Sequence, residues 1–560
     1  MAPWQQLAEQ HRNGQQAAIP KAWIIPDSKI SQLVGAGTPS EGSLITLKAA
    51  QESGLLSPLE LEITEKYDAS DLIQKMASGE LTAEDVTVAF CKRAAIAQQL
   101  TSCLTEIFFE EAIARAKELD TQFKDTGKTA GPFHGLPISM KDSFCVKGHH
   151  STMGYVANIS RPAAADNSPL VDMLLEDGAV LYCKTNIPQT LMTADSENNI
   201  FGRTLNPHKT SLTAGGSSGG EGAIVAFRAS PLGVGTDIAG SIRIPSLCCG
   251  VYGFKPTADR IPYGGQGDTP FPAVHLPGTI VPCAGPLANS VQDLEFFMKT
   301  VIDKQPWRYD HTSFNVGWRS LESSADKALT IGVLPEDPEY PFSPPVRRCL
   351  DGACASLAAA GHKLVYIPED KLSSAGLAGR LAYQFYALSP SGFDSREEII
   401  GEPQVTSVAK GVHPFSQAGF PVDPALGLED KFHQLNGARD AFAKAWQKIW
   451  RDNDLDVVLA PGANTTAVPH DAYGVPVYTM IWNLLNASLH FFFPAGIIPY
   501  GKSSKELDST PFKPTAPFEA EYDPQAWDGA PCAIQVVAPS FKDEECLKAM
   551  RLIDQALHRT

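Results

Sequence analysis

The sequence predicts an α/β protein in which helices cover a largely parallel or mixed β-sheet. Two observations support this prediction. Short apolar runs that suit buried strands alternate with segments of helical spacing. The chain has 560 residues, of which 43% are hydrophobic and 19% charged, so it can bury a large core and is not disordered.

Three helices are expected before the first long strand. One is expected after Ser70, and a second begins near Thr82, which forms an approximate capping box with Asp85. Apolar residues follow at near-helical spacing at Val86, Phe90, Ala94 and Ile96. The third helix is expected over residues 107–123, which are rich in Glu, Ala and Lys.

Apolar runs after this helical region read as strands of one sheet. They cover residues 136–140, 179–184, 232–236, 329–334, 363–367 and 457–460. Helical segments lie between them, which favours the layered α/β arrangement.

The domain organisation is expected to be simple. Residues 1–60 read as an N-terminal helical and extended arm, and residues 61–560 as one domain with surface insertions. The insertions are residues 259–282 and 501–530, which are dense in turn-forming residues. One domain is favoured because strands with core character continue beyond residue 450.

Charge and hydropathy exclude several classes of partner. The net charge is −17, from 46 basic and 63 acidic residues, which argues against nucleic acid and anionic membranes as partners. No run of eighteen apolar residues occurs, so no membrane span is expected. The nearest candidate, residues 484–500, is interrupted by Asn486, His490 and Pro494.

The eleven cysteines point to a reducing compartment. Their number is odd, and no C-x-x-C pair occurs. Met1 to Gln15 lack the apolar core of a signal peptide, so a cytoplasmic location is expected. No cluster of His, Cys and Asp has metal-ligand spacing, and we expect no metal or organic cofactor.

Three segments carry residue types suited to catalysis. Residues 213–222 place Ser217 and Ser218 among five glycines, which would be a flexible loop if taken alone. Glycine lets the backbone approach a ligand closely, so Gly215 and Gly216 are candidate substrate-binding residues. Residues 233–245 follow a strand and present Ser241 after successive backbone amides, as an oxyanion hole requires.

The third segment, residues 135–142, places Lys141 directly after an apolar strand. A lysine in this position is usually a surface residue. It can act as a base only if burial or its neighbours lower its pKa.

Taken together, these segments resemble the amidase signature family, whose central signature contains the Gly-Gly-Ser-Ser-Gly-Gly run and the run Gly-Thr-Asp-Ile-Ala-Gly-Ser-Ile-Arg-Ile-Pro. The resemblance is strong over residues 60–300 and weaker through residues 532–539. Residues 81–106, residues 189–207 and the Trp-rich N-terminus resemble the fungal acetamidase branch. The resemblance implies an α/β/α sandwich around a large twisted mixed sheet, and hydrolysis of carboxylic amides.

The resemblance also implies roles for individual residues. Ser241 is the nucleophile, Ser217 the bridging serine after a cis peptide, and Lys141 the base. The oxyanion hole is formed by the backbone N–H groups of Ile238, Ala239, Gly240 and Ser241. The family more often has Gly at the Ala239 position, so Ala239 could trim the space beside the acyl group. Leu191 matches a position that lines the substrate channel in relatives.

Three other interpretations compete with this one. Residues 216–220 fit the G-x-S-x-G nucleophile elbow, with Ser218 as nucleophile. That motif needs a downstream acid and histidine, and the available histidines are His413, His433, His470 and His490. A nucleotide-binding protein is disfavoured because neither glycine run fits a phosphate-binding motif. An amidotransferase subunit shares the signature, but the acetamidase-like N-terminus disfavours it.

The sequence leaves the acyl group open, and also whether esters are cleaved and whether the enzyme serves nitrogen scavenging or secondary metabolism. Phe385, Tyr386 and residues 491–493 could form apolar walls of the substrate site, although the three phenylalanines are favoured as core. The expected partner is a small amide, and a homodimer is the alternative to a monomer.

Overall fold

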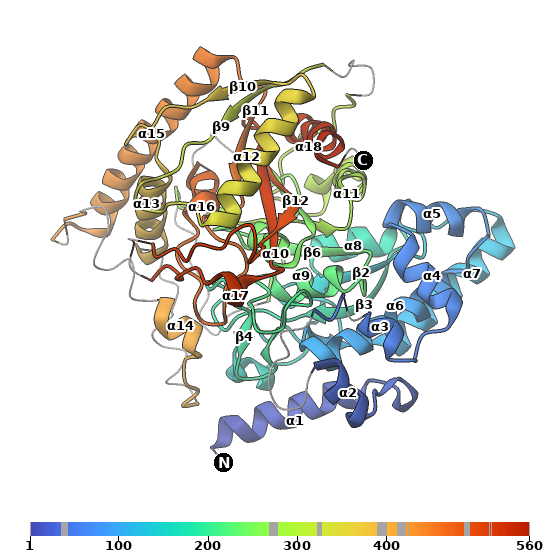
Figure 1. Ribbon diagram of the computed structural model, residues 1–560. Coiled ribbons are helices and arrows are strands. Elements are labelled where there is room, and N and C mark those ends of the chain that lie inside the picture. Colours follow the sequence, from blue (N-terminus) through green and yellow to red (C-terminus); the bar gives the residue numbers. More distant parts are fainter. Residues whose placement is uncertain are drawn as a thin grey trace.

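A mixed sheet of eleven strands runs through the computed structural model of the chain (Figure 1). The structure describes residues 2–34, 43–46, 48–267, 278–321, 327–388, 400–411, 422–423, 425–485, 493–514, 516 and 518–558. The strand order is β1-β3-β2-β6-β8-β7-β12-β13-β11-β9-β10. A separate two-stranded sheet pairs β4 (Glu197–Asn198) with β5 (Gly202–Arg203).

The strands of the large sheet are β1 Leu104–Ile107, β2 Pro137–Lys141, β3 Val180–Thr185, β6 Leu232–Asp237, β7 Tyr252–Lys255, β8 Cys283–Ala288, β9 Thr330–Val333, β10 Lys363–Tyr366, β11 Val457–Pro461, β12 Ala495–Lys502 and β13 Pro531–Val537. Neighbouring strands run parallel in the groups β3-β2-β6 and β11-β9-β10, and the other pairs are antiparallel.

Both faces of the sheet are covered. Every residue of β2, β3, β6, β8, β11 and β13 is buried. Successive side chains of a strand point to opposite faces, so complete burial requires layers on both sides. The helices that supply this cover and flank the sheet are α1 Pro3–Ala17, α2 Asp27–Val34, α3 Ala49–Glu52, α4 Pro58–Lys66, α5 Ala69–Ala77, α6 Ala83–Thr101, α7 Phe109–Thr126, α8 Pro169–Glu176, α9 Gly219–Ala226, α10 Arg243–Cys249, α11 Val291–Asp303, α12 Pro344–Ala359, α13 Ala375–Leu388, α14 Thr406–Gly411, α15 Leu428–Asn453, α16 Val477–Leu484, α17 Pro524–Trp527 and α18 Asp543–Leu557, with 3-10 turns η1 Lys21–Trp23, η2 Val156–Ser160 and η3 Pro306–Arg308.

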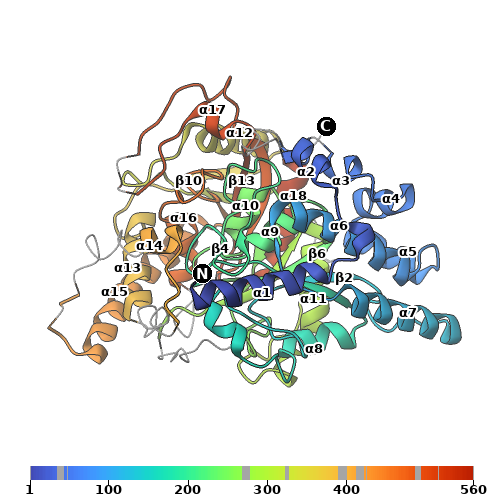
Figure 2. The same cartoon turned by 90° about the horizontal axis from the view of Figure 1, so that it is seen from below.

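Helices from two different parts of the sequence lie on opposite sides of the molecule. Figures 1 and 2 show α4, α5 and α7 on one side and α13 and α15 on the opposite side. Strands from residue 104 to residue 537 nevertheless share one sheet. This continuity agrees with a single domain over residues 61–560, which stays a prediction, as does the separate arm over residues 1–60.

The expected strands all form, within two residues of their predicted ends. The helix expected over residues 107–123 forms as α7, with β1 directly before it. Thr82 caps α6 as expected and accepts a hydrogen bond from the Asp85 amide. The helix expected after Ser70 begins earlier, because Asp68 has extended backbone angles and forms the capping box instead.

The expected insertions have little regular structure. The described parts of residues 259–282 contain no helix or strand. Strand β12 extends into the second expected insertion, residues 501–530, as far as Lys502, and the described residues after it contain only the short α17. Among the described helices, none is both long and apolar enough to cross a membrane.

Candidate active site

The candidate catalytic residues meet at one edge of the sheet. Lys141 is the last residue of β2, and Ser241 lies in the loop between β6 and α10. Strands β2 and β6 are adjacent and parallel, with Met140 opposite Val234. Their carboxyl ends therefore open at the same edge, as ligand sites of α/β sheets usually do.

Lys141 is fully buried and contacts two hydroxyl groups. Its Nζ lies 2.7 Å from Ser217 Oγ and 2.8 Å from Thr236 Oγ1. Burial lowers the pKa of Lys141 to about 7, although the carboxylates of Asp237, Glu221 and Asp142 oppose this shift. The structure thus places a partly neutral amine beside Ser217, and not the surface lysine that the sequence alone would favour.

The nearby carboxylates bind hydroxyl groups of their own. Glu221 accepts hydrogen bonds from Ser139 Oγ at 2.6 Å and Thr185 Oγ1 at 2.8 Å. Burial raises the pKa of Glu221 to about 7, with both hydroxyl bonds and Lys141 opposing the shift. Thr105 Oγ1 donates to Asp142 Oδ1 at 2.8 Å. These acids act on Lys141 through their charge and form no ion pair with it within the described residues.

The Gly/Ser run is rigidly packed, so the interpretation of a flexible loop is wrong. Residues 212–220 are all buried. The peptide between Gly216 and Ser217 is cis, as the family resemblance implies. A Cβ at Gly216 would lie 2.2 Å from the Thr193 carbonyl oxygen, so only glycine fits there. The Ser218 amide donates to the Ser241 carbonyl at 3.2 Å and ties this run to the second motif.

Asp237 organises the loop that carries Ser241. Its carboxylate accepts hydrogen bonds from the Gly240 amide at 2.9 Å and from the Arg243 guanidinium at 2.9 and 3.0 Å. Burial would raise the pKa of Asp237, but the Arg243 charge and hydrogen bonds lower it to about 2. Sequence reasoning missed this pair, although both residues lie inside the motif.

Three of the four amides expected in the oxyanion hole have no acceptor among the described residues. These are the N–H groups of Ile238, Ala239 and Ser241. The Gly240 amide differs because it is already bound to Asp237. A developing oxyanion therefore finds three unengaged donors in this loop.

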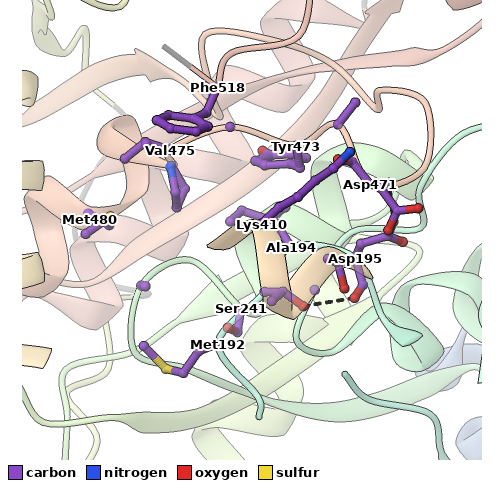
Figure 3. Close-up of a pocket in the computed structure, with 18 of the residues that line it drawn as sticks. Met192, Ala194, Asp195, Ser241, Lys410, Asp471, Tyr473, Val475, Met480 and Phe518 are labelled. Atoms are coloured by element: carbon purple, nitrogen blue, oxygen red, sulfur yellow. Dashed lines mark hydrogen bonds between the residues drawn. The ribbon is translucent and has the colours of Figure 1, made fainter. Parts of the chain in front are cut away.

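A cavity of about 470 Å³ opens beside Ser241 (Figure 3). Ser241 and Met192 lie at the bottom of the view, and Val475 and Phe518 at the top. The lining residues are Leu191, Met192, Thr193, Ala194, Asp195, Gly216, Ile238, Ala239, Ser241, Ile244, Tyr383, Tyr386, Ser407, Lys410, Asp471, Ala472, Tyr473, Gly474, Val475, Pro476, Met480, Phe518, Glu519 and Ala520. Most of the surface they offer is apolar, which suits the non-reacting part of an organic amide.

The expected wall residues divide between the cavity and the core. Leu191 and Tyr386 line the cavity, whereas Phe385 is buried near Phe432 and does not. Phe493 packs against Trp482 in the core, as favoured, and residues 491–492 lie outside the described part. Gly216 lines the cavity, whereas Gly215 is buried beside Pro245 and does not.

Ser218 is not placed as a nucleophile. It is fully buried, and its hydroxyl bonds to the backbone of Thr236 at 3.3 Å. His470 contacts the Thr210 carbonyl and Asp195 and not Ser218. His413 and His490 lie outside the described residues. No group of His, Cys, Asp and Glu in the described ranges could hold a metal ion.

Known proteins that are similar to this chain in sequence are amidases, in agreement with the geometry of the site. The family model described as Amidase matches residues 85–547. The chain belongs to the amidase family. An amidase of Gibberella moniliformis is 41% identical over 99% of both chains. An acetamidase of Emericella nidulans is 36% identical over 97% of this chain and 96% of its own. The expected family and amidase activity are thereby confirmed.

Solved structures support the fold of this amidase. A fatty acid amide hydrolase superposes with a TM-score of 0.85 at 32% identity, covering 99% of this chain and 95% of that one. The expected α/β fold with a large mixed sheet is confirmed. One chain of a glutamyl-tRNA(Gln) amidotransferase from Thermotoga maritima has a TM-score of 0.63 at 19% identity and shares the fold alone, covering 88% of this chain and 95% of its own. Neither the amidotransferase nor the Ser218 esterase interpretation is favoured.

Proposed function

We propose that this amidase cleaves carboxylic amides through an acyl-enzyme on Ser241, with Ser217 as the bridging serine and Lys141 as the base. One observation carries the proposal: the buried, desolvated Lys141 Nζ lies 2.7 Å from Ser217 Oγ. A lysine in this environment spends much of its time neutral near pH 7, and a neutral amine accepts a proton.

The chemistry proceeds in two halves. In the first, neutral Lys141 accepts the Ser217 hydroxyl proton while Ser217 accepts that of Ser241, whose oxygen attacks the amide carbon. The N–H groups of Ile238, Ala239 and Ser241 stabilise the oxyanion. When the carbon–nitrogen bond breaks, Ser217 donates a proton to the leaving nitrogen and recovers one from Lys141.

In the second half, water replaces the amine. It gives a proton to Ser217, which passes its own proton to Lys141, while the water oxygen attacks the ester carbonyl of the acyl-enzyme. The same donors bind the second oxyanion. Its collapse releases the carboxylic acid, which ionises in water, as Ser217 returns a proton to Ser241 and recovers one from Lys141. Water supplies the protons and the three side chains transfer them, so the proposed route uses no metal or organic cofactor.

The size of the cavity favours substrates larger than acetamide. A volume of about 470 Å³ lies within the range of sites for drug-sized molecules, roughly 300–1,000 Å³. Because of this volume we propose that amides with aryl or extended apolar groups are preferred. Ala239 lines the cavity beside Ser241 and narrows it there, because it takes up space that glycine would leave free.

A hydrolysis panel tests this function. Ammonia or amine release would be measured for acetamide, benzamide, indole-3-acetamide and a long-chain acyl amide, with Ser241→Ala as the matched control. We expect the larger amides to show the higher kcat/KM and the variant to show no turnover. Turnover of the panel by Ser241→Ala would contradict the acyl-enzyme proposal.

We also propose a reducing location such as the cytoplasm. Ten of the eleven cysteines are buried, and none forms a disulfide within the described residues. Buried thiols of this kind act as small apolar groups and need no oxidising compartment. Counting free thiols on protein isolated from the cell would test this proposal.

The oligomeric state is a separate question. Light scattering would distinguish a homodimer from a monomer.

A further inference from the structure

A tyrosine from the C-terminal half of the chain forms a hydrogen bond with residues 238–241, the loop proposed to form the oxyanion hole. Tyr386 lies on α13, and its hydroxyl donates to the Ile238 carbonyl oxygen at 2.6 Å. We propose that Tyr386 is a positioning residue that orients the Ala239 N–H toward the reacting carbonyl. This inference rests on the proposed function, because it assigns a task within that oxyanion hole.

The geometry of the peptide plane links the two groups. In a trans peptide the carbonyl and the following N–H point in opposite directions. The peptide between Ile238 and Ala239 is trans. A hydrogen bond that fixes the Ile238 carbonyl on one side therefore fixes the Ala239 N–H on the other.

The neighbouring peptides are fixed in the same manner. The Gly240 carbonyl accepts from the Ile244 amide at 2.7 Å, which fixes the Ser241 N–H. The Ala239 carbonyl accepts from Thr479 Oγ1 at 2.7 Å, which turns the Gly240 N–H to Asp237. Each of the three peptide planes between Ile238 and Ser241 is thus held by its own hydrogen bond. Tyr386 holds the plane that contains the Ala239 N–H.

The Tyr386 hydroxyl remains a hydrogen-bond donor, and its helix holds it in place. The Ile238 carbonyl can only accept, so the Tyr386 hydroxyl must donate. Burial raises the pKa of Tyr386 well above its usual value, so the phenol keeps its proton throughout the working pH range. Helix α13 packs closely on α16, since a Cβ at Gly379 would lie 2.7 Å from Val477 Cγ1. The tyrosine therefore reaches the loop from a tightly packed helix.

Tyr386 differs from the other restraints because the side chain that makes the hydrogen bond itself lines the substrate cavity, whereas Ile244, which also lines it, restrains the loop through its backbone. Thr479 and Ile244 hold the loop through a buried hydroxyl and a backbone amide. A substrate that packs against the Tyr386 side chain therefore contacts the group that orients one oxyanion donor. Loss of the hydroxyl removes no donor from the hole, but it frees one peptide plane to rotate.

Tyr386→Phe tests the proposal because it keeps the ring and removes only the hydrogen bond. We expect kcat to fall roughly tenfold to a hundredfold, less than the 10²–10³-fold that loss of a whole oxyanion donor costs. KM should change little. The rate constant for phosphonylation of Ser241 by a fluorophosphonate should fall by a similar factor, because its P=O oxygen occupies the same hole. Active-site titration expresses each rate per folded site.

Two comparison variants separate this effect from others. Tyr252→Phe removes a tyrosine hydrogen bond to Asp554 outside the cavity and should leave both rates unchanged. Tyr473→Phe changes another tyrosine that lines the cavity, and its buried hydroxyl has no hydrogen-bond partner among the described residues, so any effect should lie in KM. A Tyr386→Phe enzyme with normal kcat, or with a loss in KM alone, would overturn the inference. Failure of the fluorophosphonate to label wild-type Ser241 would overturn the proposed function instead.

Discussion

Lys141 Nζ lies 2.7 Å from Ser217 Oγ in a site where burial is the main influence on the amine. Since the lysine pKa is lowered to about 7, the amine is mainly protonated below that pH and mainly neutral above it. In the proposed mechanism the neutral form of Lys141 is the base. We therefore expect kcat/KM to rise about tenfold per pH unit below pH 7 and to level off above it. A pH–rate profile that is flat between pH 5 and pH 8 would contradict this assignment.

Glu221 has a pKa raised to about 7 and could produce the same acidic limb. Glu221→Gln separates the two groups. The change removes a negative charge that raises the pKa of Lys141, so the limb should move to lower pH. If the limb disappears in this variant, Glu221 and not Lys141 is the titrating group.

Lys141→Arg distinguishes a lysine that accepts a proton from a lysine that acts only through its positive charge. Arginine keeps the charge but does not give up its proton in a protein. We expect Lys141→Arg and Lys141→Ala to lose more than about a hundredfold in kcat, the lower part of the range for general-base catalysis. High pH should recover part of the alanine variant's rate, because hydroxide replaces the base.

Lys184 provides the matched control for this experiment. It is also a fully buried lysine with a lowered pKa, and it donates to the His150 carbonyl and Ser151. Lys184→Ala should lower the free energy of unfolding and leave the acidic limb in place. Near-normal turnover by Lys141→Arg would show that Lys141 acts through its positive charge and not as a base.

Gly240→Ala should damage the loop that carries Ser241. Gly240 has φ +131°, and a Cβ would lie 2.3 Å from Thr479 Oγ1. Thr479 would then lose its hold on the Ala239 carbonyl, so we expect kcat to fall at least about tenfold. Gly361→Ala is the control, since Gly361 has φ +91° but open space around its Cα. Equal kcat values in the two variants would show that the Thr479 contact is irrelevant.

Metal chelation should leave the activity unchanged. No group of metal ligands exists among the described residues, and the proposed route moves every proton through side chains and water. Dialysis against EDTA and 1,10-phenanthroline, followed by kcat measurement, tests this. A loss of rate that added zinc restores would refute it.

Strand prediction succeeded where side-chain pattern and burial agree. The runs that became β2, β3 and β6 are apolar enough to be recognised. Strand β8 was missed because Gly285 and Pro286 read as breakers, yet all six of its residues are buried and paired with β6. Tertiary pairing overrides local preference there.

The catalytic candidates were predictable because glycine-rich motifs surround them. Thr236 and Thr479 were not assigned roles in the site, and Tyr386 was considered only as an apolar wall, although each donates or accepts a hydrogen bond there. Tyr386 and Thr479 lie 148 and 240 residues along the chain from the loop residues that they bind. No local pattern marks such a contact, since it arises only when α13 and α16 pack beside the loop.

The location of the acyl-enzyme tests the account most directly. The protein would be treated with a fluorophosphonate, digested, and analysed by mass spectrometry, with Ser241→Ala and Ser218→Ala as matched variants. Ser241 lines the cavity, whereas Ser218 is fully buried and bonded to Thr236. The account predicts one adduct on Ser241, present in Ser218→Ala and absent in Ser241→Ala. An adduct on Ser218 or on any cysteine of the wild-type protein would contradict it.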